Sequence, residues 1–143
     1  MQEDILVAVP TRKVYKEATI AIAAFMAGPL AGGVLMAENF RSLGKSKAAT
    51  TAIVLSFLFT VLIFLSVLVP ATENIPTFLY SILYAIVASL VTRRFQKKEI
   101  EAHIAQGGLL HSGWRAFGIS IICLIVMVAA MFGMLYLMDP EAW

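Results

Sequence analysis

Four long stretches without charged residues or histidine constrain this chain more than any other feature. They cover residues 18–37, 48–69, 76–92 and 116–138. Each is close to the length of about 20 residues that a helix needs to cross a hydrocarbon core about 30 Å thick. The chain is 143 residues long and 60% hydrophobic, which is more apolar surface than a soluble domain of this size can bury. We therefore predict an all-α integral membrane protein, a four-helix transmembrane bundle that forms a single domain.

The segments between these stretches predict where the helices begin and end. Gly44 can close the first helix in the left-handed conformation, and two glycines can end a helix that follows the third stretch. That later segment, "RRFQKKEIEAHIAQGG", places apolar residues toward one side and charged residues toward the other, so we expect an amphipathic helix at the membrane interface. The expected elements are an N-terminal tail (1–17), transmembrane helices at 18–43, 46–69, 75–92 and 113–138, and the amphipathic helix at 93–107.

Small residues and a proline interrupt the first stretch, where a simple lipid anchor would carry leucine. Ala24, Gly28 and Gly32 recur every four residues, a pattern that lets another helix approach the backbone closely. Pro29 removes one helical hydrogen bond and bends the segment. The residues expected to mediate helix packing or assembly, inside the bundle or against another subunit, are Ala24, Gly28, Pro29, Gly32 and Gly33.

The distribution of Lys and Arg predicts the orientation and leaves two arrangements of the first stretch open. The first and third loops are basic, whereas the charge in the second loop is Glu73, so loops one and three are expected on the cytoplasmic side and the C-terminus outside. A full but kinked first span would put Arg12, Lys13 and Lys16 outside. A re-entrant first segment would keep all 11 Lys and Arg residues inside, but its broken helix must be buried by protein or line water.

A few residues are expected at the two membrane interfaces. Glu38 and Arg41 are three residues apart at the cytoplasmic end of the first stretch, a spacing that favours an ion pair. Trp114 precedes the last stretch and Trp143 follows it, and indole rings favour the headgroup layer. We expect all four residues to lie at the interfaces.

Little in the sequence resembles a chemical site. Glu99 and His103 are four residues apart and His111 follows, which could be read as a metal or acid–base group, but no compact repeat of ligands accompanies them. The single cysteine, Cys123, has no partner for an intrachain disulfide. The four stretches also lack the ionisable side chains that a proton-coupled carrier would need. We predict no catalytic residue, metal or cofactor, and the net charge of +2 gives no reason to expect nucleic acid as a partner.

Three segments carry a resemblance to a known group of proteins. They are "YKEATIAIAAFMAGPLAGGVLMAENFRSLGK", "ENIPTFLYSILYAIVA" and "GWRAFGIS". The chain resembles uncharacterised small bacterial polytopic membrane proteins that carry a Gly-Pro-Leu-Ala-Gly stretch followed by Asn-Phe and Leu-Gly. The resemblance covers residues 15–126 and implies one domain in the bacterial cytoplasmic (inner) membrane. It carries over neither an activity nor functional residues.

These observations lead to a hypothesis of function by contact. We expect an accessory, regulatory or immunity-type subunit, rather than an enzyme, that assembles in the lipid bilayer with another membrane protein or as a homo-oligomer. The alternative is a homo-oligomeric channel or pore for ions or small solutes, with main-chain carbonyls of the broken first stretch lining the path. An enzyme that acts on lipid headgroups through Glu99, His103 or His111 is a third alternative.

Overall fold

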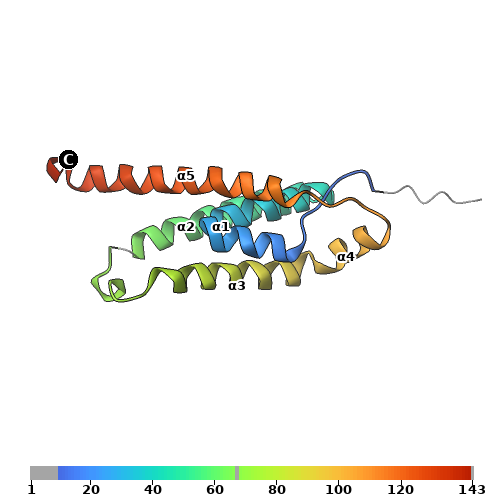
Figure 1. Cartoon of the computed structure of the whole chain (residues 1–143), viewed down its shortest axis with the longest axis horizontal. Helices are drawn as coiled ribbons and strands as arrows, with labels where there is room; N and C mark the ends of the chain where they lie inside the picture. The colour runs from blue at the N-terminus through green and yellow to red at the C-terminus, as the bar shows by residue number, and fades with distance from the viewer. Residues whose placement is uncertain (1–9, 67, 143) are drawn as a thin grey trace, which may run out of the picture.

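The computed structural model describes residues 10–66 and 68–142, and this part of the chain is almost entirely helical. Four helices are long and apolar enough to cross a membrane, which confirms the prediction of an all-helical integral membrane protein at this level. The elements in chain order are α1 (Glu17–Ser42), α2 (Ser46–Ser66), the 3₁₀ turn η1 (Pro70–Thr72), α3 (Thr77–Phe95), α4 (Lys97–Ala105), α5 (Gly113–Met138) and the 3₁₀ turn η2 (Pro140–Ala142) (Figure 1).

Helix α1 lies at the centre of the molecule. It packs against α2, α3 and α5, whereas these three make little contact with one another. Figure 1 shows α1 between α5 on one side and α3 on the other. Most of the buried hydrophobic residues belong to α1, so the core consists of this helix and the faces turned toward it.

The chain of α1 reverses its direction halfway along. Ala27 (φ −131°, ψ 17°) and Gly28 (φ 78°, ψ −174°) have non-helical dihedral angles and precede Pro29. A Cβ atom built on Gly32 would lie 3.0 Å from the Cβ of Ala24, although these residues would be about 12 Å apart along a straight helix. The two halves, residues 17–26 and 29–42, therefore lie side by side and antiparallel (Figure 1). We call this unit the α1 hairpin.

Contacts at the two ends of α1 support the same reversal. The Arg12 guanidinium, before the first half, donates to the main-chain oxygen of Arg41 at the end of the second half at 3.0 Å. At about 1.5 Å per residue, the first half is about 15 Å long and the second about 21 Å. A straight helix of 26 residues would cross a hydrocarbon core about 30 Å thick, whereas each half by itself is shorter than that thickness.

The reversal gathers the positive charges of the chain at one end of the bundle. This basic end contains the segment before α1, the last turn of α1, the connection to α2, the first turn of α2, the C-terminal turn of α3, α4 and the first turn of α5. All 11 Lys and Arg residues belong to these segments. The opposite end contains η1 and η2, with Glu73, Asp139 and Glu141.

Close packing of the α1 hairpin depends on its small residues. A Cβ atom on Gly33 would lie 2.1 Å from the Ser56 Oγ, so α2 approaches the backbone of α1 at this point. Gly32 similarly faces Ala88 of α3, where an added Cβ would lie 3.6 Å from the alanine Cβ. Gly28 faces the methyl group of Met127 in α5, at 3.3 Å from an added Cβ. Each outer helix thus meets the hairpin at a glycine.

The α1 hairpin fills only part of the bundle. Its turn lies at the level of Met127, and α5 continues for about 16 Å beyond that residue. We define the far half as residues 61–66 of α2, 77–83 of α3 and 128–138 of α5. No residue in these three segments is buried. Past the turn of the hairpin, the outer helices therefore have no core in common within the described chain.

Local signals determine most helix ends. Gly44 adopts a positive φ of 79° directly after α1, as expected for a residue that closes a helix. The Ser112 hydroxyl accepts from the main-chain N–H of Trp114 at 3.2 Å and caps α5. Helix α3 continues to Phe95, three residues beyond the expected boundary, and Gln96 separates it from α4. The short α4 buries Ile100 and His103.

Candidate functional site

The strongest concentration of buried polar groups lies at the basic end, around Asn39. This residue belongs to the second half of α1 and is fully buried. Its Oδ1 accepts from the main-chain N–H of Tyr15 at 2.7 Å, and its Nδ2 donates to the main-chain oxygen of Tyr15 at 2.9 Å. The side-chain amide thus satisfies both main-chain groups of one residue in the segment before α1, as a neighbouring strand would.

Gln96 extends this network to the break between α3 and α4. Its Nε2 donates to the main-chain oxygen of Met36 at 2.8 Å, and its Oε1 accepts from Asn39 Nδ2 at 3.3 Å. Gln96 is also buried, with 1% of its surface exposed. Buried amides in this arrangement are well satisfied, so they fix the position of α3 relative to the α1 hairpin.

Hydrogen bonds fix the segment before α1 in place at the basic end. Val14 donates its N–H to the Leu109 oxygen at 3.2 Å, and its own oxygen accepts from the N–H of His111 at 2.9 Å. The Val14 side chain is fully buried. This isolated parallel bridge connects the segment to the chain between α4 and α5. The expected tail thus has fixed contacts from Arg12 onward, and its residues 1–9 lie outside the described part of the chain.

Tyr15 brings several titratable groups together. Its ring stacks on His111 with a centroid distance of 4.4 Å. Burial and the neighbouring Glu38 carboxylate raise the pKa of Tyr15 to about 12, so the phenol stays protonated at neutral pH. Burial and the nearby Arg115 guanidinium lower the pKa of His111, which keeps the imidazole neutral. The protonated phenol is a weak nucleophile, and its ring packs against the imidazole of His111.

Ion pairs surround this network. The Glu38 carboxylate accepts from the Arg115 guanidinium at 3.2 Å. The expected pair between Glu38 and Arg41 is wrong, because Glu38 points to the start of α5, and no ion pair joins it to Arg41 among the residues that the structure describes. The long-range partner from α5 replaces the local one, which the sequence spacing alone could not indicate.

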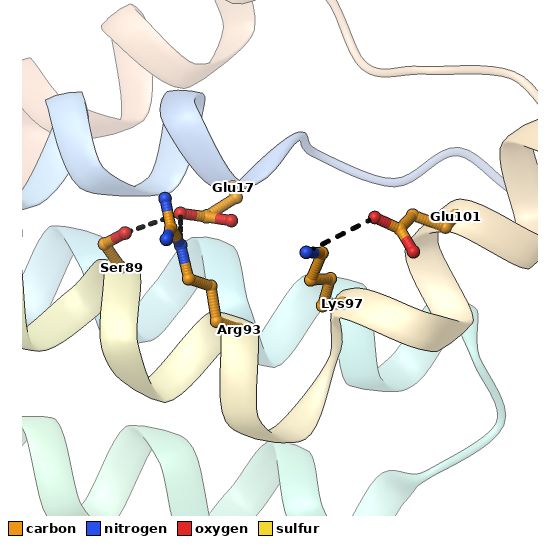
Figure 2. Close-up of polar contacts among 5 residues, drawn as sticks. All are labelled: Glu17, Ser89, Arg93, Lys97 and Glu101. Atoms are coloured by element: carbon orange, nitrogen blue, oxygen red, sulfur yellow. Dashed lines mark hydrogen bonds and ion pairs between the residues drawn. The ribbon is translucent and has the colours of Figure 1, made fainter.

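A second set of charges fastens the first half of α1 to α3. Figure 2 shows Glu17, at the start of α1, facing Ser89 and Arg93 of α3. The Arg93 Nε donates to Glu17 Oε1 at 2.6 Å, and the Ser89 hydroxyl donates to the same oxygen at 2.5 Å. The Lys97–Glu101 pair in the same view, at 3.8 Å, lies within α4. The contacts of Glu17 place the start of α1 beside the end of α3.

The three residues considered for metal or acid–base chemistry have other partners. Glu99 pairs with Lys45, which ties α4 to the start of α2. The buried His103 places Nε2 at 3.1 Å from the Leu109 oxygen, and His111 stacks on Tyr15. Within residues 10–66 and 68–142, no group of three or more His, Cys, Asp or Glu residues could hold a metal ion.

The small residues singled out in the first stretch all lie inside the molecule or line a groove in it. Ala24 contacts Gly32 across the α1 hairpin, and Gly28 and Gly33 face α5 and α2. Pro29 lines a groove between α2 and α3. These small residues therefore pack within the chain, which is one of the two roles expected of them.

Two of the residues expected at the interfaces, Trp114 and Arg41, lie in the described part of the chain, and Trp143 does not. The Trp114 ring is 82% exposed at the basic end and packs edge-on against Phe117. Trp143 lies outside the described residues. Arg41 is exposed and offers its main-chain oxygen to Arg12. At the basic end, Trp114 and Arg41 thus lie on the surface of the bundle.

Two grooves run along the α1 hairpin. The α2–α3 groove has a volume of about 210 Å³, with Pro29, Gly32 and Gly33 at its floor and walls from α2 and α3. The second groove, about 240 Å³, lies between the first half of α1 and the start of α5, beside Phe117 and Ser120. Both grooves are bordered mainly by apolar side chains.

Sequence reasoning missed the residues that organise this region: Tyr15, Asn39 and Gln96. One signal was present, because Asn39 and Gln96 are uncharged amides at the edges of apolar segments, where burial requires a hydrogen-bond partner. The partners themselves are 24 and 57 residues from Asn39 in sequence, so their identity could not be inferred.

The chain was compared with protein families, curated proteins and solved structures. The chain matches no protein family, no curated protein and no solved structure.

Proposed function

We propose that α2, α3 and α5 cross the bilayer and that α1 enters it as a re-entrant hairpin from the cytoplasmic side. In this arrangement every Lys and Arg residue lies on one side of the membrane, in agreement with the preference of basic residues for the cytoplasmic side. The broken backbone at Gly28 is tolerable because the hairpin is surrounded by the other three helices. The N-terminus is then cytoplasmic and the C-terminus outside, with α4 as an amphipathic helix at the inner interface.

Single-cysteine labelling tests this arrangement. Cys123→Ala removes the native thiol, and Lys13→Cys, Lys47→Cys and Glu73→Cys are then introduced one at a time. A membrane-impermeant maleimide should reach the first two positions from the same side and Glu73→Cys from the other. Labelling of Lys13→Cys and Lys47→Cys from opposite sides would show that the first segment crosses the membrane completely.

Within this arrangement, we propose that the protein acts by contact, as an accessory or regulatory subunit of another membrane protein. The observation that carries this proposal is the far half, where three apolar helices continue past the α1 hairpin without a buried residue. Membrane helices associate by close packing, so a partner helix that enters this space supplies the missing contacts. The far half is then the surface at which the partner's activity is regulated or its structure stabilised.

Native mass spectrometry of the complex, extracted gently from its own membrane, tests the proposed role. Ala130→Trp adds bulk three residues after Met127, on the side of α5 that faces the α1 hairpin. Ile125→Trp is the matched control, because Ile125 is 62% exposed and lies about 200° around the helix from Met127. A reproducible companion chain should be lost with Ala130→Trp and kept with Ile125→Trp. A wild-type protein without any companion would contradict the proposal.

A homo-oligomeric channel is the second candidate, and one feature of α1 favours it. The second half of α1 begins at Pro29, so the free N–H groups of a helix start lie inside the bundle and next to the far half. A ring of such ends around an oligomer axis could line a path for ions or small solutes. The channel predicts a closed homo-oligomer and ion flux from purified protein in liposomes. Absence of flux from correctly oriented protein would eliminate it.

A further inference from the structure

The α2–α3 groove has an apolar lining and runs toward a basic residue, Arg94. Gly32 and Gly33 of the α1 hairpin line the groove between the two outer helices. Leu55 and Phe59 of α2 face Val87 and Tyr84 of α3 across this space. The groove has a volume of about 210 Å³ and is bounded almost wholly by apolar atoms.

The course of the groove leads to the basic end. Val87, Val91 and Arg94 are separated by four and three residues, so they share one face of α3. The first two line the groove, and Arg94 lies one turn further, at its mouth. On the opposite wall, Ala52 lines the groove one and a half turns into α2, close to the basic connection that contains Lys45.

Arg94 differs in its pairing from three neighbouring basic residues. Arg93 binds Glu17, Lys45 binds Glu99, and Lys97 binds Glu101. Among the described residues, no ion pair joins Arg94 to a carboxylate; its exposed guanidinium lies 5.9 Å from the ring centre of Phe95. A guanidinium without an intrachain counter-ion at the mouth of an apolar groove matches the two parts of a phospholipid.

We propose that the α2–α3 groove binds one acyl chain of an anionic phospholipid, with the lipid phosphate at Arg94. The acyl chain fills the space above Gly32 and Gly33, and the headgroup stays at the level of the basic end. This inference rests on the proposed placement of the basic end at the cytoplasmic headgroup layer. The lipid acts there as a wedge that keeps α2 and α3 apart on the two sides of the α1 hairpin.

The groove is tested with variants that fill it. Val87→Phe adds a ring at the wall of the groove, and Ile86→Phe adds the same ring at the neighbouring position, which is 51% exposed and does not line the groove. The proteins are reconstituted in nanodiscs that contain equal amounts of phosphatidylglycerol and phosphatidylcholine, and retained lipids are counted by native mass spectrometry. Val87→Phe should lower lipid retention about tenfold, equivalent to about 1.4 kcal/mol, and Ile86→Phe should behave as wild type.

The charge is tested separately. Arg94→Gln should abolish the preference for phosphatidylglycerol over phosphatidylcholine, whereas Lys98→Gln, at another exposed basic position, should keep it. Wild-type protein that retains no lipid, or equal retention by Val87→Phe and Ile86→Phe, would overturn the proposal. A chain dimer that Val87→Phe disrupts would also overturn it, because the groove would then hold protein.

The lipid site and the proposed arrangement in the membrane can be rejected separately. Cysteine labelling at Lys13 and Lys47 reports the side of each segment whether or not lipid binds. Correct labelling with no retained lipid would reject the lipid site alone. Lys13 and Lys47 on opposite sides would reject the re-entrant arrangement, whatever the lipid count.

Discussion

Helices α1 and α5 have the same length, 26 residues, and opposite environments. In the most apolar part of each helix, 61% of the α1 residues are buried, against 6% in α5. The buried helix is rich in alanine and glycine, while the exposed one is rich in isoleucine, leucine, methionine and valine. Because lipid tails are as apolar as leucine, burial in a membrane follows side-chain size rather than apolarity.

The largest expected effect comes from placing a large residue in the buried helix. Gly33→Leu forces a side chain onto Ser56, where even a Cβ would lie 2.1 Å from the hydroxyl oxygen. We expect a loss of about 3 kcal/mol or more in the free energy of unfolding, at the upper end for overpacked positions. The change should be measured as the denaturation midpoint of the purified protein in detergent.

Gly133→Leu in α5 is the control for this prediction. Nothing lies within 4 Å of a Cβ atom at Gly133, so the larger side chain meets open space. Its midpoint should equal that of wild type. Equal losses in the two variants would show that glycine serves the same purpose in both helices, and the contrast between them would fail.

The second prediction concerns the buried amide that holds the segment before α1. Asn39→Leu keeps a similar volume but leaves the main-chain N–H and C=O of Tyr15 without their partners. Since an unsatisfied buried group costs about 1–3 kcal/mol, we expect a loss of about 2–3 kcal/mol. Hydrogen exchange at the amide of Tyr15 should become faster in the same variant. Asn74→Leu, at an exposed position, should change neither quantity.

A smaller effect is expected at the turn of the α1 hairpin. Gly28 has a φ of 78°, a conformation that residues with a side chain rarely adopt. Gly28→Ala should cost about 1–2 kcal/mol through backbone strain, whereas Gly118→Ala, in the regular helix α5, should not destabilise the protein. A chemical denaturation series that orders the two variants the other way would argue against the reversal at Gly28.

The smallest expected effect is on the dependence of stability on pH. The pKa of His111 is about 6.5 in the unfolded chain and lower in the folded protein. At a pH between the two pKa values, the unfolded chain therefore binds more protons than the folded one. Stability should therefore be unaffected at pH 7 and should fall as the pH drops below about 6.5. His111→Phe keeps a ring against Tyr15 but cannot titrate. If its stability fell as steeply with decreasing pH, another group would be responsible.

The sequence predicts the helices of this protein better than their arrangement. The four apolar stretches and the glycine after α1 depend on local chemistry, which a single chain displays directly. The course of α1 depends on contacts made by Asn39, Gln96 and Arg115 across the fold. A glycine and a proline at 28–29 fit both a kinked span and a reversal, so the first stretch left both open.

The partners in the polar network could not be predicted from the sequence either. Its amides and carboxylates carry no motif, and their partners come from distant segments such as the end of α3 and the start of α5. Local spacing even suggested the wrong partner for Glu38, because Arg41 lies three residues away. Only the assembled fold brings Arg115 to this carboxylate.

The contacts of the α1 hairpin also set the order in which the chain can be completed during synthesis. Arg93, Gln96, Arg115 and Met127 all hold α1, and all leave the ribosome after it. The α1 hairpin therefore acquires its final contacts only after α2, α3 and α5, which follow it in the sequence, have been synthesised.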